Sequence, residues 1–338
     1  MKLSILSSIE NDSADAQSFA EQSSGFLRLG TLASALGYST LFVFKNSANR
    51  KNLVSDPLLL QAAMATQVGS LRLGVGFAPL SYFDPIALAE NCATLDVLSG
   101  GRLTVAVDDG AMMKENQAID LSLIQQENRV RENRELLRMA LTGRRFSAVG
   151  TNRRMSNLQI AIQPRQTPHP PIHMAVYDRQ SARMAGSSGF RIFIAPLAAL
   201  QSPSDVSGIV EAYRDAQELA GATARDDDII AFCLAHSADD DRHAMESGRR
   251  AFHAHALVRP NWVCRSFDDA VDLDYFLVGG PARIREKFAR LEATGIHHVA
   301  LMPSFGGLTL EDVFRSARLF AGVVAEKPET AEPPRAVG

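Results

Sequence analysis

The stretch LRLGVGFAPLSYFDPIALAENCATLDVLSGGRL, residues 71–103, decides the fold. Its first seven residues, 71–77, are rich in branched apolar side chains and predict a strand. Asp84-Pro85 supplies a capping side chain and a helix-opening proline, and the apolar residues that follow recur at helical spacing. The glycine-rich residues 99–101 end that helix, and a second strand is predicted over residues 102–107. The stretch is therefore a strand–helix–strand unit, which joins two parallel strands.

The same alternation continues in both directions along the chain. Short apolar segments predict strands at residues 2–7, 39–44, 71–77, 102–107, 172–176, 190–195, 229–234 and 299–302. These segments are apolar throughout, which is typical of parallel strands buried on both faces. We predict an α/β fold, a (β/α)8 or TIM barrel, because a doubly wound open sheet rarely contains eight such units.

One segment interrupts the alternation after the fourth unit. Residues 145–162 are polar and β-prone and predict a hairpin, and the proline-rich residues 163–171 predict a rigid connector. We therefore expect one domain over residues 1–326 with an insertion at 145–170. The tail 327–338 has little to bury and is expected to be disordered.

Composition limits the partners of the protein. The 338 residues contain 35 Lys and Arg against 38 Asp and Glu, without a basic cluster, which argues against a nucleic-acid-binding surface. The three cysteines lie far apart and are expected to be reduced thiols in a cytoplasmic protein. The N-terminal apolar run is too short for a signal peptide, and no stretch of 18 apolar residues predicts a membrane span.

In a barrel of this type, chemistry takes place at the carboxyl ends of the strands. His236 follows the seventh predicted strand and is the best candidate for a general base. The pairs His253/His255 and His297/His298 have no Cys or carboxylate at ligand spacing, so no metal site is expected.

Four segments, in order along the chain, resemble a known family. They are MKLSIL (1–6), the stretch 71–103, PRQTPHPPIHMA (164–175) and VGGPARIREKFARLEATGIHHVALMP (278–303). Through them the chain resembles the bacterial-luciferase-like flavin-dependent monooxygenases over residues 2–324.

The resemblance implies a TIM barrel with an insertion after the fourth unit, commonly assembled as a homodimer or heterodimer. It implies reduced FMN, supplied by a separate flavin reductase, or a deazaflavin in some relatives. Molecular oxygen would be activated as a peroxide at the flavin C4a position. The oxygenated substrate would be a small organic molecule such as an aldehyde, a sulfonate or an amine.

The resemblance also assigns candidate site residues. After the second strand the family usually has Glu-His-His, and this chain has Asn46, which can form hydrogen bonds but cannot transfer a proton near pH 7. After the fourth strand, Asp109 replaces an arginine that meets the flavin phosphate. Phe77-Ala78 ends the third strand, where the family often has a non-proline cis peptide behind the flavin ring; an ordinary strand end is the alternative interpretation.

After the fifth strand, the family holds the flavin phosphate with small hydroxyl residues at a helix start. This chain has Tyr177, Asp178, Arg179 and Ser181 there, and only Ser181 matches. Asp178 also has a plain structural interpretation as a helix cap, in which its carboxylate occupies the amides that a phosphate would use. Arg179 could offset one of the acids.

Three functions are therefore considered. The first is an FMN-dependent monooxygenase with an altered phosphate pocket. The second is a flavin-free, non-catalytic subunit or binding protein, which the substitutions at Asn46 and Asp109 favour. The third is a deazaflavin-dependent oxidoreductase, for which only the shared fold argues.

Overall fold

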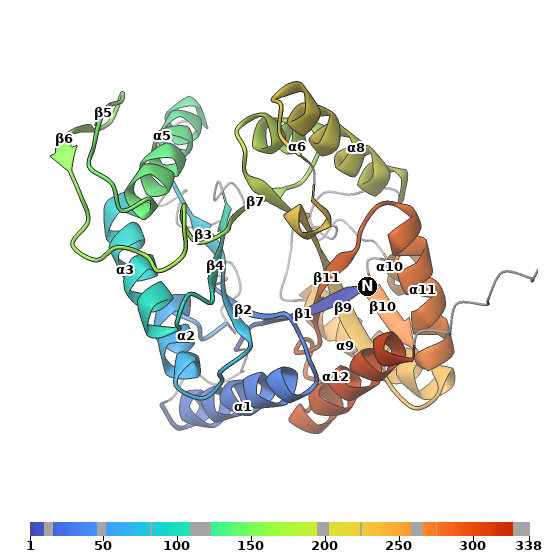
Figure 1. Ribbon diagram of the computed structural model, residues 1–338. Helices are drawn as coiled ribbons and strands as arrows, with labels where there is room; N and C mark the ends of the chain where they lie inside the picture. The colour runs from blue at the N-terminus through green and yellow to red at the C-terminus, as the bar shows by residue number, and fades with distance from the viewer. Residues whose placement is uncertain are drawn as a thin grey trace, which may run out of the picture.

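A computed structural model gives the structure of residues 1–9, 16–45, 52–81, 83–108, 123–194, 203–223, 225–257, 266–274 and 276–326. Eight parallel strands close into a barrel with helices packed around it (Figure 1). The barrel strands are β1 (Lys2–Ser7), β2 (Thr40–Phe44), β3 (Arg72–Pro79), β4 (Leu103–Asp108), β7 (Ile172–Val176), β8 (Arg191–Ile194), β9 (Ile229–Ser237) and β11 (His298–Met302). The predicted TIM barrel is confirmed.

The helices follow the strands in the order that the sequence predicts. They are α1 (Ala16–Ala35), α2 (Pro57–Ala65), α3 (Pro85–Leu98), α5 (Leu123–Leu141), α6 (Arg179–Ser187), α8 (Pro203–Leu219), α9 (Asp241–Leu257), α10 (Phe267–Asp272), α11 (Pro281–Ala293) and α12 (Leu310–Ala325), with a 3-10 turn η1 (Asp226–Asp228). The predicted hairpin is also present, as the antiparallel strands β5 (Phe146–Val149) and β6 (Arg154–Leu158).

Two short elements were not predicted. Helix α10 and strand β10 (Phe276–Gly279) lie between α9 and α11. Strand β10 pairs with residues 234–237 of β9, beyond the residues 229–231 that pair with β8. The seventh barrel strand therefore extends further than the sequence indicated, to Ser237.

The two Asp-Pro sequences begin helices as predicted. Asp56 accepts a hydrogen bond from the Leu58 amide at 2.8 Å, and Asp84 accepts from the amides of Ile86 and Ala87 at 3.0 Å each. Each proline occupies the first helical turn, where no amide hydrogen is needed. These caps fix where α2 and α3 start after β2 and β3.

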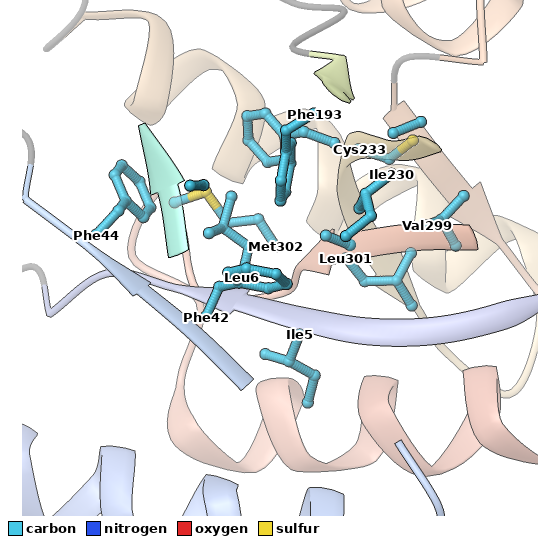
Figure 2. Close-up of a cluster of buried hydrophobic side chains, with 14 of the residues drawn as sticks. Ile5, Leu6, Phe42, Phe44, Phe193, Ile230, Cys233, Val299, Leu301 and Met302 are labelled. Carbon is cyan, nitrogen blue, oxygen red and sulfur yellow. The ribbon is translucent and has the colours of Figure 1, made fainter. Parts of the chain in front are cut away.

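The barrel interior is filled from β2 across to β8. The ring of Phe42 lies edge-on to the ring of Phe193 at 5.3 Å, and both side chains are fully buried. Figure 2 shows these two rings together with Leu6 and Met302 in the barrel core. Because β2 and β8 are not neighbours in the sheet, this contact crosses the interior.

Two glycines of β3 make room for the rings of β2. A side chain at Gly74 would overlap the Phe42 ring, and a Cβ at Gly76 would lie 2.7 Å from the Phe44 Cβ. Such distances are too short for packed carbon atoms. The inner face of β3 is therefore bare at these positions, and aromatic side chains of the next strand occupy the space.

None of the described helices is both long enough and apolar enough to cross a lipid bilayer.

The substitution Gly74→Ala tests this packing. It should lower the free energy of unfolding by about 1–3 kcal/mol, because the new methyl group displaces the Phe42 ring from a filled core. The matched control is Gly322→Ala in α12, where nothing lies within 4 Å. That change should be neutral or stabilising by up to about 1 kcal/mol, because alanine favours helix. Urea unfolding measures both, and equal effects would contradict the packing argument.

Candidate active site at the carboxyl end of the barrel

The carboxyl ends of the barrel strands bring several predicted site residues to one end of the molecule. Among the described residues, Phe77, Ala78, Tyr177, Asp178 and Ser181 lie at or just after strand ends there. Ser7 at the end of β1 also faces Ser304 after β11, with 3.4 Å between the two hydroxyl oxygens. The candidates Asn46 and Asp109 lie outside the described residues.

Phe77 has the most unusual backbone at this end. Its φ is +51°, a region that bulky residues rarely adopt, and the pairing of β3 with β4 shifts register between Val75 and Ala78. The Phe77–Ala78 peptide bond is trans, since Thr167–Pro168 is the only cis bond among the described residues. The cis bond suggested by the resemblance is therefore absent, and the local distortion is a bulge at Phe77.

The bulge places the Phe77 ring among other aromatic rings. The ring lies edge-on to Phe193 at 4.9 Å and to Phe44 at 6.0 Å. Phe77 is partly exposed, whereas Phe42, Phe44 and Phe193 are buried. We call Phe42, Phe44, Phe77 and Phe193 the aromatic cluster. Phe77, the partly exposed member, has a backbone conformation that costs about 1–3 kcal/mol, and such strain is common at binding sites.

A polar pair stands beside the aromatic cluster on the neighbouring strands. The Tyr177 hydroxyl donates a hydrogen bond to Asp108 Oδ2 at 2.6 Å. Asp108 ends β4 and is 9% exposed, and Tyr177 follows β7, the next strand of the barrel. The carboxylate therefore fixes the direction of the phenol at the barrel mouth.

The start of α6 is closed by its own residues. Asp178 Oδ1 accepts hydrogen bonds from the Ser181 amide at 2.7 Å and from the Ser181 hydroxyl at 2.8 Å. The Ser181 hydroxyl oxygen in turn lies 3.2 Å from the amides of Tyr177 and Asp178. This capping box occupies the Ser181 amide, one of those that an anion at the helix start would meet, and places a carboxylate beside it.

The Arg179 guanidinium lies against α8, because a side chain at Gly208 of α8 would overlap it. The offset predicted for Arg179 concerned the carboxylates of Asp109 and Asp178, and it stays a prediction because Asp109 lies outside the described residues.

His236 faces the helix layer. Its Nε2 lies 2.7 Å from the Ser247 hydroxyl of α9, and its ring is close to Gly248 of the same helix. The side chain is 2% exposed, and this burial lowers its pKa to about 4. The imidazole lies in the wall between β9 and α9, which does not support the predicted role of general base.

Sequence reasoning missed Asn133, a buried residue of α5 that holds the loop after Phe77. Its side-chain amide donates to the carbonyl of Leu80 at 2.7 Å. A signal was present, because Asn133 falls on the apolar face of its helix, three residues after Val130 and four before Leu137. A polar side chain in that position is usually hydrogen-bonded inside the protein.

The arrangement suits a planar organic ring better than a phosphate or a metal. The aromatic cluster offers an apolar surface for stacking, and the Tyr177–Asp108 pair offers a polar edge. The carboxylate at the start of α6 opposes an anion at that helix. In the part of the chain that the structure describes, no group of three or more His, Cys, Asp or Glu could hold a metal ion.

Comparisons with known proteins find similar sequences and structures. The sequence model of a family described as luciferase-like monooxygenase matches residues 1–298. The chain is 26% identical over 199 residues to the oxygenase component of flavin-dependent trigonelline monooxygenase from Acinetobacter baylyi, a match covering 58% of this chain and 55% of that protein.

Solved structures of monooxygenases have the same fold. Monooxygenase RslO1 from Streptomyces bottropensis superposes with a TM-score of 0.88 at 26% identity, covering 96% of this chain and 99% of that one. The oxygenating constituent of 3,6-diketocamphane monooxygenase from Pseudomonas putida, in complex with FMN, superposes with a TM-score of 0.80 at 19% identity, covering 97% and 98%. Other similar proteins are named as F420-dependent or coenzyme F420-dependent.

The positive φ of Phe77 predicts that glycine is more stable than alanine at this position, the reverse of the usual order in a strand. Phe77→Gly should unfold with a free energy about 1 kcal/mol higher than Phe77→Ala, because only glycine adopts a positive φ without strain. At the control position Val75, which has ordinary strand geometry, alanine should be the more stable of the two. Urea unfolding of the four variants gives the comparison, and a more stable alanine at position 77 would contradict the strained bulge.

The position of His236 predicts a dependence of stability on pH. The folded-state pKa of about 4 lies below the ordinary value of 6.5, so the unfolded chain binds more protons between these values. The free energy of unfolding therefore decreases as pH falls below 6.5. At pH 5 the titration of His236 accounts for a decrease of about 2 kcal/mol. In His236→Gln the fall in unfolding free energy from pH 7 to pH 5 should be smaller by this amount.

The control is His253→Gln, at an exposed histidine of the same helix. Its unfolding free energies at pH 7 and pH 5 should differ as those of the wild type do. If His236→Gln behaved like this control, the imidazole would not be buried in the wall.

Proposed function

The chain belongs to the luciferase-like monooxygenase family, and we propose that it is a flavin-dependent monooxygenase acting on a small organic substrate. The observation that carries the proposal is the strained, partly exposed Phe77 at the mouth of the barrel. Its ring, packed edge-on against the buried rings of Phe44 and Phe193, offers an aromatic surface against which a planar isoalloxazine can stack. Backbone strain held at such a surface is typical of a binding site.

Reduced FMN is the cofactor that we propose. When bound, it would supply the electrons that activate molecular oxygen. The aromatic cluster fits the flavin ring, but the start of α6 does not fit its phosphate, because the Asp178 carboxylate already accepts the hydrogen bonds there. We therefore infer that the ring supplies most of the affinity and that α6 contributes little to it.

The residues of the chain would exclude water and orient the substrate. The buried rings of the aromatic cluster keep the inner side of the mouth apolar, which strengthens polar interactions made there. The Tyr177–Asp108 pair is the fixed polar group next to this surface and would hold a polar part of the substrate by hydrogen bonding. His236 takes no part in this proposal, because its imidazole faces α9.

The proposed partners are molecular oxygen, a small substrate and a separate flavin reductase. The similar trigonelline monooxygenase chain is named as an oxygenase component, and this name supports a two-component system. Assembly as a dimer and a cytoplasmic location are further proposals, which rest on the sequence alone.

A second candidate function is a flavin-free subunit or binding protein of the same family. The specific observation in its favour is again the capping box at the start of α6, which places a carboxylate where the resemblance expects a phosphate. The two candidates differ in whether the aromatic mouth binds a flavin at all.

The test compares FMN with riboflavin, which has the same ring but no phosphate. Fluorescence titration of the wild-type protein should give saturable binding at tens of micromolar or below for both flavins, with affinities within about tenfold of each other. Asp178→Ser retains a good capping residue but removes the carboxylate, so it should strengthen FMN binding about tenfold or more and leave riboflavin binding unchanged.

Two results would count against the proposal. If neither oxidised flavin, nor reduced FMN under oxygen-free conditions, binds saturably, the flavin-dependent function is wrong and the flavin-free subunit stands. If FMN binds more than a hundredfold more tightly than riboflavin and Asp178→Ser changes neither affinity, the phosphate is held elsewhere and the ring is not the main anchor.

A further inference from the structure

The opposite end of the barrel contains a cavity of its own. Its volume is about 650 Å³, it opens at the amino ends of the strands, and Phe42 of the aromatic cluster lies at its inner end. Residues from all eight barrel strands line it, among them Lys2, Arg72, Thr104, His173, Arg191 and His298. The proline-rich connector also contributes to its wall.

Two buried histidines in this wall have unused nitrogens. His298 Nε2 lies 2.7 Å from the Ser4 hydroxyl, and His173 Nδ1 lies 3.4 Å from the Thr104 hydroxyl. The other nitrogen of each ring, His298 Nδ1 and His173 Nε2, is buried without a hydrogen-bond partner in the described part of the chain. Both residues line the cavity and are 4% and 3% exposed, and buried polar groups of this kind are usually hydrogen-bonded.

Positive charge exceeds negative charge around the cavity. Lys2, Arg72, Arg191 and Arg225 line it, against the single carboxylate of Asp227. Lys2 pairs with Asp227 at 2.7 Å, and Arg191 pairs at 3.2 Å with Asp228, which lies behind the wall.

Two of these cations, Arg72 and Arg225, form no ion pair among the described residues, and Arg72 is the more buried of the two. Its guanidinium donates to the Leu103 carbonyl at 2.7 Å and to the Gln166 side chain at 2.9 Å. Burial and the neighbouring Arg191 lower the pKa of Arg72, and the more distant carboxylates of Asp96 and Asp227 act in the opposite direction.

We propose that this cavity binds a small oxyanion, the phosphate or carboxylate group of a metabolite. An oxyanion accepts hydrogen bonds from the buried imidazoles and forms a direct ion pair with Arg72, which has none among the described residues. Ordered water would satisfy the histidine nitrogens but would not offset the excess of positive charge around the cavity.

The neutral histidines link this binding to protons. Burial, together with Arg191, His298 and Arg72, holds the pKa of His173 well below its ordinary range, and burial with Lys2 lowers that of His298 to about 3. Asp227 acts in the opposite direction on His298. An anion placed beside the rings favours their charged forms, so its binding should raise both pKa values and take up protons.

Calorimetric titration of the full-length protein with inorganic phosphate, and separately with succinate, tests the proposal. Saturable binding of at least one probe at low salt is expected, and the tighter probe identifies phosphate or carboxylate as the preferred group. Repeating the titration in buffers of different ionisation enthalpy should reveal proton uptake. Arg72→Met and Lys2→Met should each weaken binding by about tenfold or more.

The design includes a second test variant and a control variant. Lys2 has a 41% exposed side chain, so Lys2→Met keeps the test valid if Arg72→Met fails to fold. Arg154→Met removes an exposed arginine of the β5–β6 hairpin and should leave binding unchanged. Absence of saturable binding for both probes, or equal binding by wild type, Lys2→Met and Arg72→Met, would overturn the proposal.

Discussion

The bare inner face of β3 is the constraint on which the candidate active site depends. Because Gly74 and Gly76 carry no side chains, the rings of Phe42 and Phe44 from β2 occupy the interior beside β3. The strand then slips its register against β4, and Phe77 adopts a positive φ that brings its ring against Phe193. The aromatic cluster is therefore a consequence of how two neighbouring strands share the space inside the barrel.

The two ends of the barrel have different chemistry. The carboxyl end combines aromatic rings with the Tyr177–Asp108 pair and a helix start closed by a carboxylate. The amino end combines buried neutral imidazoles with arginine and lysine side chains around a cavity. Acidic groups thus stand where the family resemblance leads one to expect a phosphate, and basic groups surround the other opening.

Much of the fold could be predicted from the sequence, because parallel strands buried on both faces are apolar throughout and the helices begin with clear signals. Asp84-Pro85, for example, caps α3 as expected. Strand β10 and helix α10 were missed because they are four and six residues long and fall between longer elements. The register slip at Phe77 could not be predicted either, because it depends on contacts with β4 and β8.

The candidate site could be predicted only in part. The strand-end rule placed Phe77, Tyr177 and Ser181 at one end, but it does not give the direction of a side chain. His236 illustrates this limit. Strand β9 continues beyond the barrel to pair with β10, and the imidazole of His236 lies against α9 and not in the barrel mouth. Asn46 and Asp109 stay predictions, since they lie outside the described residues.

The central claim is that a flavin binds at the carboxyl end of the barrel, against the aromatic cluster. Hydrogen–deuterium exchange with and without FMN tests it most directly, because exchange reports protection segment by segment. Slower exchange is predicted at residues 77–81 and 177–181, with no change at residues 166–173. Protection confined to residues 166–173, or none at all with saturating FMN, would contradict the claim.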